Sequence, residues 1–181
     1  MKFVLIRHLA PLVAPGVCYG RLDVPLDPAA ASLIGARASD PALRGASRVW
    51  SSPASRCMPL AEAIALALNA TLTVDPRLQE LDFGEWEGKP WDTVARTELD
   101  RWAASPLTFA PPGGESGEEL IRRVRDFAGD LWQFQKDCVI VSHGGPLKVL
   151  AALVQRKPVD LLASAPPMGS LTVLTMSACL I

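Results

Sequence analysis

Five short apolar runs alternate with segments of helical pattern along the chain. The runs lie at about 2–7, 47–51, 71–75, 137–142 and 170–176, and their length and composition predict strands. The first run is almost wholly apolar, which is typical of a strand buried on both faces of a sheet. Strands that alternate with helices predict a three-layer α/β/α sandwich with a mostly parallel central sheet.

Two residue pairs that end in proline predict helix starts in the first half of the chain. Asp27-Pro28 has the N-cap and first-turn residues of a helix, which we expect to run to about Ala38. Ser52-Pro53 repeats this pattern ahead of a helix through Leu68. That second helix would carry Arg56 in its first turn.

The second half of the chain has clearer helix boundaries. A capping-box pattern at 116–119 opens a helix whose apolar residues recur at helical spacing up to Phe134. Gly144-Gly145-Pro146 introduces a last helix to about Val154. The stretch 106–117, rich in proline and glycine, is predicted to be a loop within the same domain.

Length and charge narrow the class of protein. The chain has 181 residues, of which 49% are hydrophobic, so we expect residues 1–181 to form a single domain. Lys and Arg number 18 against 19 Asp and Glu, which gives no reason to expect nucleic acid or a membrane as a partner. Because Arg7-His8 interrupts the first apolar run before it could serve as a signal peptide, we expect a cytoplasmic protein. The oligomeric state stays open.

The cysteines do not have the spacing of a metal site. Cys18, Cys57, Cys138 and Cys179 form no C-x-x-C pair. Cys138 and Cys179 lie in strand-like runs and are interpreted as core residues. Nothing near Cys18 or Cys57 favours a reactive thiolate. We therefore expect no metal and no other cofactor.

The chain has two histidines, and each directly follows a predicted strand. His8 ends the run at 2–7, and His143 ends the run at 137–142. A single histidine is more often a surface or core residue than a catalytic one. The carboxyl ends of parallel strands, however, meet at the edge where open α/β sheets place their active sites. Two histidines at that edge favour a functional site.

Further polar residues follow the same strands. Arg7 precedes His8, Arg56 follows the second strand, and Glu80 follows the third within Leu78–Gly88. Two arginines, two histidines and a carboxylate at one edge suit a phosphoryl group, because the guanidinium group pairs bidentately with phosphate oxygens. The N-terminus of the last helix would add backbone N–H donors.

The order of these residues resembles that of the histidine phosphatase superfamily, the phosphoglycerate-mutase-like proteins, over nearly the whole chain. Its signature is Arg-His on the first strand, followed by a second Arg, a Glu and a second His. The motifs Ser51–Arg56 and Phe83–Gly88 are similar to those of its small phosphatases. The string Cys18–Leu26 resembles the substrate loop of alpha-ribazole phosphatases, which act late in cobalamin nucleotide-loop assembly.

The resemblance implies a role for each catalytic candidate. His8 would attack phosphorus and become phosphohistidine. Arg7 and Arg56 would clamp the phosphoryl oxygens, with His143 as a further donor. Glu80 would protonate the leaving alkoxide and then deprotonate the attacking water.

The same resemblance names substrate-binding candidates outside this set. Tyr19, Gly20 and Arg21 would contact the substrate from the Cys18–Leu26 string, and Gly144 would contribute at the helix N-terminus. No metal is implied, because the arginines neutralise the charge.

Several residues in these motifs have simpler interpretations. Glu80 has rivals in Asp82, Glu85 and Glu87, most of which must be solvated. Trp86 and Trp91 are expected to serve packing. In a separate stretch of the chain, Glu115 follows two glycines and is interpreted as a loop carboxylate.

The chain also departs from the family pattern beside the nucleophile. Leu9 replaces the usual glycine after Arg-His, so the pocket is expected to be narrowed or reshaped. The stretch Ala10–Ala14 is apolar where the family often has a polar residue, which makes Arg21 a candidate for the missing donor.

The sequence thus predicts phosphomonoester hydrolysis through phosphohistidine, with alpha-ribazole phosphate as the first substrate hypothesis. A broad-specificity phosphatase or a protein phosphohistidine phosphatase is one alternative, because one fold hosts many substrates. An isomerase of the phosphoglycerate mutase type is another. A non-catalytic phosphate-binding module is a third, motivated by Leu9 and opposed by the presence of all five core residues.

Overall fold

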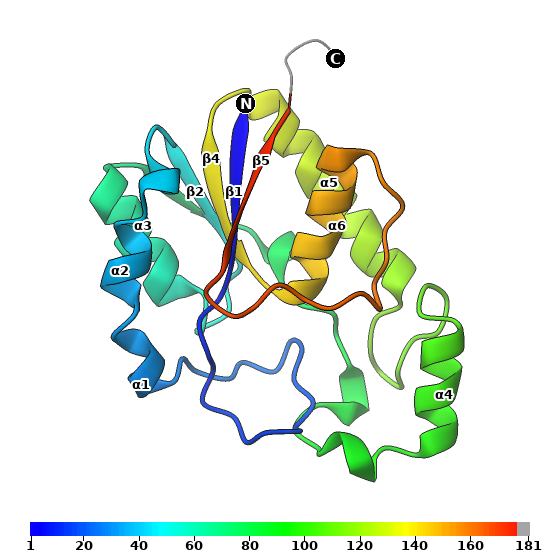
Figure 1. The fold of residues 1–181 in the computed structure, drawn as a ribbon. Helices are drawn as coiled ribbons and strands as arrows, with labels where there is room; N and C mark the ends of the chain where they lie inside the picture. Colours follow the sequence, from blue (N-terminus) through cyan, green and yellow to red (C-terminus); the bar gives the residue numbers. More distant parts are fainter. Residues whose placement is uncertain (177–181) are drawn as a thin grey trace.

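A five-stranded sheet forms the centre of the molecule (Figure 1). The computed structural model describes residues 1–176. The strand order is β3-β2-β4-β1-β5, and all neighbours are parallel except β1 and β5. The predicted, mostly parallel sheet is confirmed. The strands are β1 Lys2–Arg7, β2 Arg48–Ser51, β3 Thr71–Val74, β4 Cys138–Ser142 and β5 Leu171–Thr175.

Helices cover both faces of the sheet, as the sequence predicts. In Figure 1, α1, α2 and α3 lie on one side, and α5 and α6 lie on the other. Helix α4 and the long loops gather beyond the carboxyl ends of the parallel strands. The helices are α1 Pro28–Ala31, α2 Ile34–Ala38, α3 Met58–Leu68, α4 Arg96–Ala104, α5 Gly117–Phe134 and α6 Gly144–Gln155. Short 3₁₀ turns lie at Pro41–Leu43, Pro76–Leu78, Gly84–Trp86 and Trp91–Thr93.

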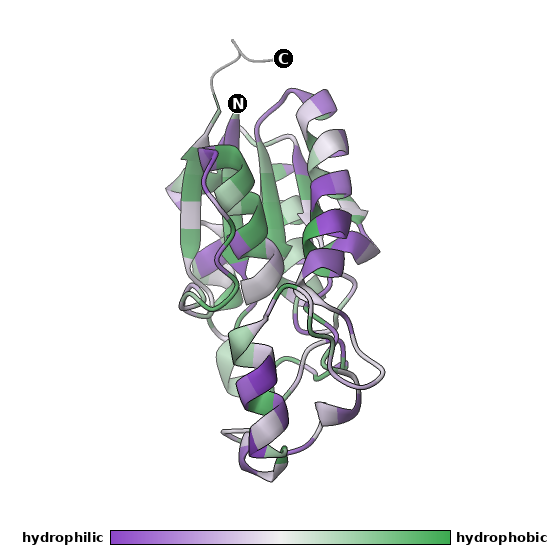
Figure 2. Ribbon diagram, turned by 90° about the vertical axis from the view of Figure 1, so that its right-hand side faces the viewer, coloured by the Kyte–Doolittle hydropathy of each residue, from purple (hydrophilic) through white to green (hydrophobic). Residues whose placement is uncertain are grey.

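The two-residue period of the strands divides the core into two layers. On β1, Phe3 and Leu5 are buried against α5 and α6, whereas Val4 and Ile6 are buried on the face of α3. The strands are mostly hydrophobic in Figure 2, and hydrophilic stretches lie on the helices. A strand buried on both faces needs this continuous apolar sequence.

Two helix predictions in the first half are wrong. The helix expected to run to Ala38 is interrupted at Ser32 and Leu33, which separate α1 from α2, and the Ser32 hydroxyl donates to Ala29 O at 2.9 Å there. Ser52-Pro53 does not open a helix, since α3 begins at Met58. Arg56 therefore lies in the turn before α3, not in its first helical turn. Asp27 does cap α1 as predicted.

The second half follows the sequence prediction more closely. Ser116 and Glu119 form the predicted capping box of α5, and α6 begins at Gly144. No helix or strand lies between Ser105 and Ser116, as predicted for the loop. Helix α4 was not predicted. It is a short helix whose apolar residues Leu99 and Trp102 are only partly buried, so its apolar stripe spans a single turn.

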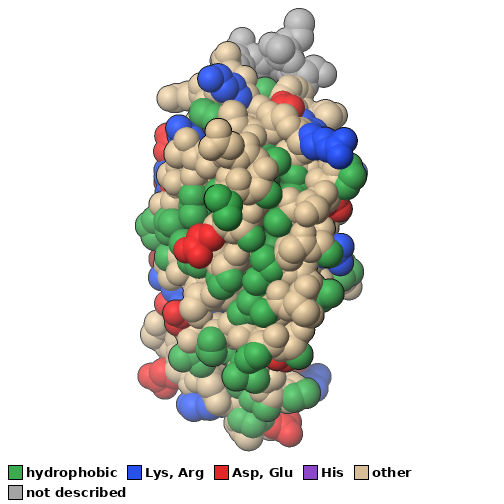
Figure 3. Space-filling model, turned by 90° about the vertical axis from the view of Figure 1, so that its left-hand side faces the viewer, with side chains coloured by type: hydrophobic (Ala, Val, Ile, Leu, Met, Phe, Trp, Pro, Cys, Tyr) green, Lys and Arg blue, Asp and Glu red, His purple; other side chains and the backbone are tan. Residues whose placement is uncertain are grey.

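The surface carries both signs of charge. On the face that holds α1, α2 and α3, Figure 3 shows acidic and basic side chains interspersed among hydrophobic ones. No helix within residues 1–176 is long and apolar enough to cross a membrane.

Candidate active site

Strands β1 and β4 bring the two histidines together. These strands are adjacent and parallel, with Arg7 paired to Ser142, so the residues that follow them leave the sheet side by side. The rings of His8 and His143 lie 5.1 Å apart between centroids, and each residue is 1% exposed. The predicted meeting of the two imidazoles is therefore found in the structure.

The His8 ring is held in one orientation. Its Nδ1 lies 2.6 Å from the carbonyl oxygen of Leu9. A carbonyl only accepts, so Nδ1 carries the proton and Nε2 keeps its lone pair. Burial lowers the pKa of His8 to about 3, and the charges of Arg56 and Arg7 act in the same direction. The imidazole is therefore neutral at physiological pH.

His143 is buried among polar side chains. Its Nε2 lies 2.8 Å from the Ser52 hydroxyl and 3.6 Å from Cys57 Sγ. Burial lowers the pKa of His143 well below its usual value, and Arg56 adds to this. Within residues 1–176, its Nδ1 has no hydrogen-bond partner.

The cysteines near these histidines are unreactive thiols. Burial raises the pKa of Cys57 and of Cys18 to about 12, so neither is a thiolate at neutral pH. Cys138 is buried in β4, as interpreted from its strand-like run. Cys179 lies outside the described residues.

Two arginines enclose the histidines and leave donors free. The guanidinium of Arg56 donates to Gly20 O at 2.6 Å and Leu22 O at 3.0 Å, and Arg7 donates to Pro166 O at 2.8 Å. Both Nε atoms are buried, and no described residue accepts from either of them. An unpaired buried donor is costly unless a ligand satisfies it. The arrangement therefore suits an anion.

Glu80 reaches the N-terminus of α6. Its carboxylate accepts from Gly145 N at 3.0 and 3.2 Å and from Leu81 N at 3.0 Å. The residue itself lies outside regular secondary structure, between two 3₁₀ turns.

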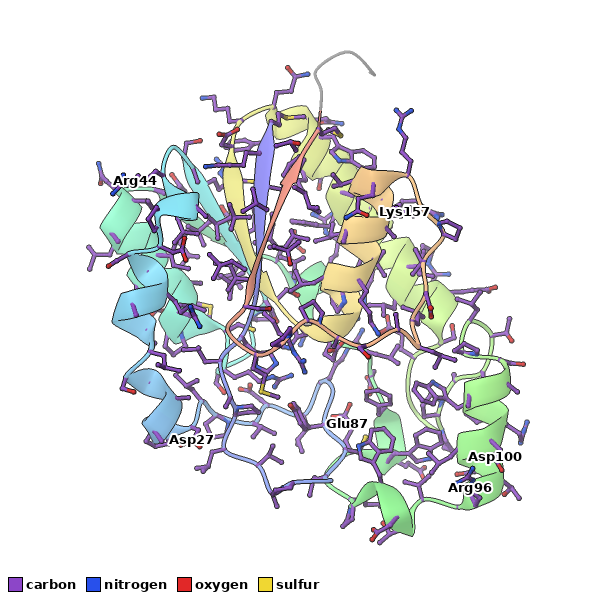
Figure 4. All side chains as sticks on the ribbon, viewed as in Figure 1. Asp27, Arg44, Glu87, Arg96, Asp100 and Lys157 are labelled. Carbon is purple, nitrogen blue, oxygen red and sulfur yellow. The ribbon has the colours of Figure 1, made fainter. Side chains whose placement is uncertain are left out.

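The three rival carboxylates point elsewhere. Asp82 accepts from Gly84 N at 2.9 Å, and Glu85 is exposed. Glu87 accepts from the backbone N–H groups of Arg21, Leu22 and Phe83. It lies where the loop after β1 meets the segment after β3 (Figure 4). Glu85 is thus solvated as expected, whereas Asp82 and Glu87 are partly exposed and also hold backbone N–H groups.

A cavity of about 170 Å³ joins these groups. Its predicted members are Arg7, His8, Tyr19, Arg56, Glu80 and His143, and Val17 and Trp91 complete the lining. Trp91 was expected to serve packing alone, whereas Trp86 is buried as predicted. Among the described residues, no group of three or more His, Cys, Asp or Glu side chains is placed to hold a metal ion.

The predicted substrate string lies beside this cavity with its members in different positions. The ring of Tyr19 lies 5.4 Å from the Arg56 guanidinium. Gly20 passes so close to the next segment that a Cβ would lie 1.9 Å from Leu81 O. Arg21 does not line the cavity and pairs instead with Asp82 and Glu115 at 3.5 and 3.3 Å.

Gly144 is the first residue of α6 and lies close to Arg7. A Cβ at this position would approach Arg7 Cζ to 3.9 Å and Ala165 Cβ to 2.8 Å. The residue thus stands at the helix N-terminus beside the arginine, where the sequence places it.

Leu9 does not obstruct the cavity. Its side chain is 2% exposed and packs in the core on the α3 side, close to Gly169. The contact that His8 needs comes from the Leu9 carbonyl, which any residue supplies. The expected narrowing of the pocket is therefore not found, because Leu9 is not among the residues that line it.

Ser52 and Glu115 were misinterpreted from the sequence, and Arg123 was missed. The Ser52 hydroxyl contacts His143 and does not cap a helix. Glu115 is not a solvated loop carboxylate, because it is 8% exposed and pairs with Arg123. The sequence gives only a weak signal for this ion pair. Glu115 directly precedes the capping box at 116–119, and Arg123 follows it by eight positions.

We expect both imidazoles to stay neutral in the free enzyme from about pH 8 down to about pH 5, because burial lowers both pKa values. Imidazole ¹⁵N shifts measure this directly, and the chain contains two histidines. His8 should have the pattern of an Nδ1-protonated ring. In denaturant, both rings should titrate near the usual 6.5. A native imidazole with that midpoint would contradict the structure.

Known proteins are similar to this chain in sequence and in fold. Residues 3–179 match the family profile described as histidine phosphatase superfamily, branch 1. A candidate phosphoserine phosphatase 2 of Hydrogenobacter thermophilus is 32% identical over 158 residues, covering 84% of this chain and 78% of its own. Mycobacterial relatives, 34% identical over 158 residues, are longer, and this chain spans 43% of them.

Solved structures agree with this comparison. A mycobacterial glucosyl-3-phosphoglycerate phosphatase superposes with a TM-score of 0.83 at 25% identity, over 95% of this chain and 88% of that one. The alpha-ribazole phosphatase of Shigella flexneri has a TM-score of 0.88 at 22% identity, over 98% and 92%, a likeness of fold alone. With the profile match over nearly the whole length, the chain belongs to branch 1 of the histidine phosphatase superfamily and is a phosphatase.

Proposed function

We propose that this phosphatase hydrolyses small phosphomonoesters through a phosphohistidine at His8. The observation that carries the proposal is the hydrogen bond from His8 Nδ1 to the Leu9 carbonyl. It leaves a neutral Nε2 lone pair on a residue that shares its cavity with Arg7 and Arg56, whose Nε donors no described residue pairs.

The residues suit a two-step reaction. Nε2 of His8 attacks phosphorus, and the bond from phosphorus to the ester oxygen breaks as Glu80 gives its proton to that oxygen. Water then attacks the phosphohistidine while Glu80 takes its proton, which releases phosphate and the free imidazole. Arg7, Arg56 and His143 stabilise the phosphoryl oxygens in both steps.

The first substrate hypothesis is alpha-ribazole phosphate. The loop string Cys18–Leu26 supports it. A second cavity of about 160 Å³ shares Arg7 and Glu80 with the first but not His8. It therefore adjoins Glu80, and we place the leaving alcohol in it. Phe83 and Trp102 line this cavity, which suits an alcohol that carries an aromatic base.

Phosphoserine is a second candidate. The Hydrogenobacter relative, with 32% identity, favours it by its name. The amino acid left after hydrolysis is small and charged, so it would gain little from an aromatic wall.

A substrate panel tests the proposal. We expect kcat/KM to be highest for alpha-ribazole phosphate against phosphoserine, 3-phosphoglycerate and a phosphohistidine peptide. Trp102→Ala should lower kcat/KM for alpha-ribazole phosphate about tenfold, because base stacking contributes on the order of 1–3 kcal/mol. The same variant should leave phosphoserine hydrolysis within about twofold.

The other outcomes separate the alternatives. Faster hydrolysis of phosphoserine would replace the first substrate by the second, and a fast phosphohistidine peptide would favour a protein phosphatase. Conversion of 3-phosphoglycerate to its isomer would favour a mutase. Binding of a phosphomonoester without release of inorganic phosphate would favour a non-catalytic binding module.

A further inference from the structure

Glu80 lies on a segment with no regular secondary structure, yet general acid catalysis needs its carboxyl in a fixed place. The flanking 3₁₀ turns end at Leu78 and begin again at Gly84. A misplacement of about 1 Å at a reacting group can cost about 10²-fold in rate. Gly145 N and Leu81 N donate to the Glu80 carboxylate itself, and the backbone that carries Glu80 has a separate support.

Arg123 holds it from α5. Its guanidinium donates to the backbone carbonyls of Arg77 at 2.7 Å, Gln79 at 2.7 Å and Glu80 at 2.9 Å. The helix that carries Arg123 is itself anchored, since Leu120 and Val124 on either side are buried in the core. Arg123 thus ties the segment that carries Glu80 to a rigid element.

Glu115 completes the arrangement. Its carboxylate accepts from Arg123 Nε at 2.7 Å and from Nη2 at 2.9 Å. With the three carbonyls, these bonds use all five N–H groups of the guanidinium. Arg123 therefore has no N–H group left to bind a substrate, whereas Arg7 and Arg56 do.

The same carboxylate faces the substrate loop. Arg21 lies 3.3 Å from Glu115 and 3.5 Å from Asp82. The backbone of the Glu115 loop is fixed as well, because Glu115 N donates to Asp82 O at 2.9 Å. Glu115 therefore contacts α5, the acid-bearing segment and the substrate loop.

We propose that Arg123 and Glu115 are positioning residues that place the Glu80 carboxyl against the leaving oxygen, an inference that rests on Glu80 being the acid of the proposed function. Lysine has three donors on one nitrogen and cannot span three carbonyls and a carboxylate. Arg123→Lys keeps the positive charge beside buried Glu115, so it releases the backbone without leaving that carboxylate unpaired.

The experiment compares a poor and a good leaving group. In Arg123→Lys, the burst rate on an alkyl phosphate should fall about 10- to 100-fold, because the acid is misplaced. The burst rate on p-nitrophenyl phosphate should fall less than about threefold, since its phenolate leaves without a proton.

Glu115→Gln should give the same selective loss and serves as the test if the Arg123→Lys variant does not fold. Arg122→Lys, on the exposed neighbour, is the matched control and should match wild type on both substrates.

Glu80→Gln separates this inference from the proposed function. The Glu80→Gln variant should show the selective loss by itself. Adding Arg123→Lys to Glu80→Gln should lower the burst rate little further, because both substitutions remove the same contribution, general acid catalysis by Glu80. Equal losses on both substrates in Glu80→Gln would remove Glu80 as the acid. A selective loss in Glu80→Gln, with equal losses or none in both Arg123→Lys and Glu115→Gln, would overturn the positioning role alone. Thermal unfolding of each variant identifies losses that come from instability.

Discussion

His8→Ala is expected to abolish phosphate release and the covalent phosphoenzyme together. The variant lacks the one neutral nitrogen whose lone pair is held toward the cavity by the Leu9 carbonyl. Loss of a nucleophile of this kind costs at least about 10⁴-fold in kcat. Rapid quench with ³²P-labelled substrate measures both quantities, and phosphohistidine is recognised because it is labile in acid and stable in base.

His143→Ala is the matched control for the labelling experiment. It removes the proposed donor to the phosphoryl group but retains His8, so label should still form, about 10²–10³-fold more slowly. After His8→Ala, His143 is the remaining histidine of the chain. Label that persists in His8→Ala with the same acid and base stability would move the nucleophile to His143.

Arg56→Lys is expected to lower kcat/KM by about 10²–10³-fold, although the charge is conserved. Arg56 is 1% exposed, and its terminal nitrogens donate to Gly20 O and Leu22 O, whereas its Nε, which no described residue pairs, is the proposed donor to the phosphoryl group. A lysine ammonium has one nitrogen and cannot do both. Steady-state kinetics and inhibition by inorganic phosphate measure the loss.

Arg96→Lys is the control for Arg56→Lys. Arg96 and Asp100 form an exposed pair on α4 at 2.8 Å (Figure 4), and neither residue lines the cavity. Exposed pairs contribute little, so this variant should retain kinetics within about twofold. Near-native kinetics in Arg56→Lys, with its fold intact, would remove Arg56 from the phosphate site.

The fold was predictable where local pattern and tertiary structure agree. The five apolar runs became the five strands, and the capping box at Ser116 opened α5. The antiparallel direction of β5 could not be predicted from the sequence. Side chains alternate between the two faces of a sheet with the same two-residue period in parallel and antiparallel strands. Ser52 was misread because its hydroxyl contacts His143, a partner far along the chain, and does not cap α3.

The site was predictable where its members follow strands. Arg7, His8 and His143 leave adjacent parallel strands, so the topology brings them together. Arg123 and Arg21 have no such signal, because their partners are backbone carbonyls and carboxylates of distant loops. Contacts between a side chain and a distant backbone leave no periodic pattern in a sequence.

The position of β1 inside the sheet, between β4 and β5, has a consequence for biosynthesis. Its neighbours β4 and β5 begin at Cys138 and Leu171. At about 5–20 residues per second, a ribosome needs on the order of ten seconds to reach them after making β1. For that time the apolar stretch Phe3–Ile6 has neither of its sheet partners, so we expect the nascent chain to bind chaperones that recognise exposed hydrophobic segments. His8 and His143 meet only after most of the chain has been translated.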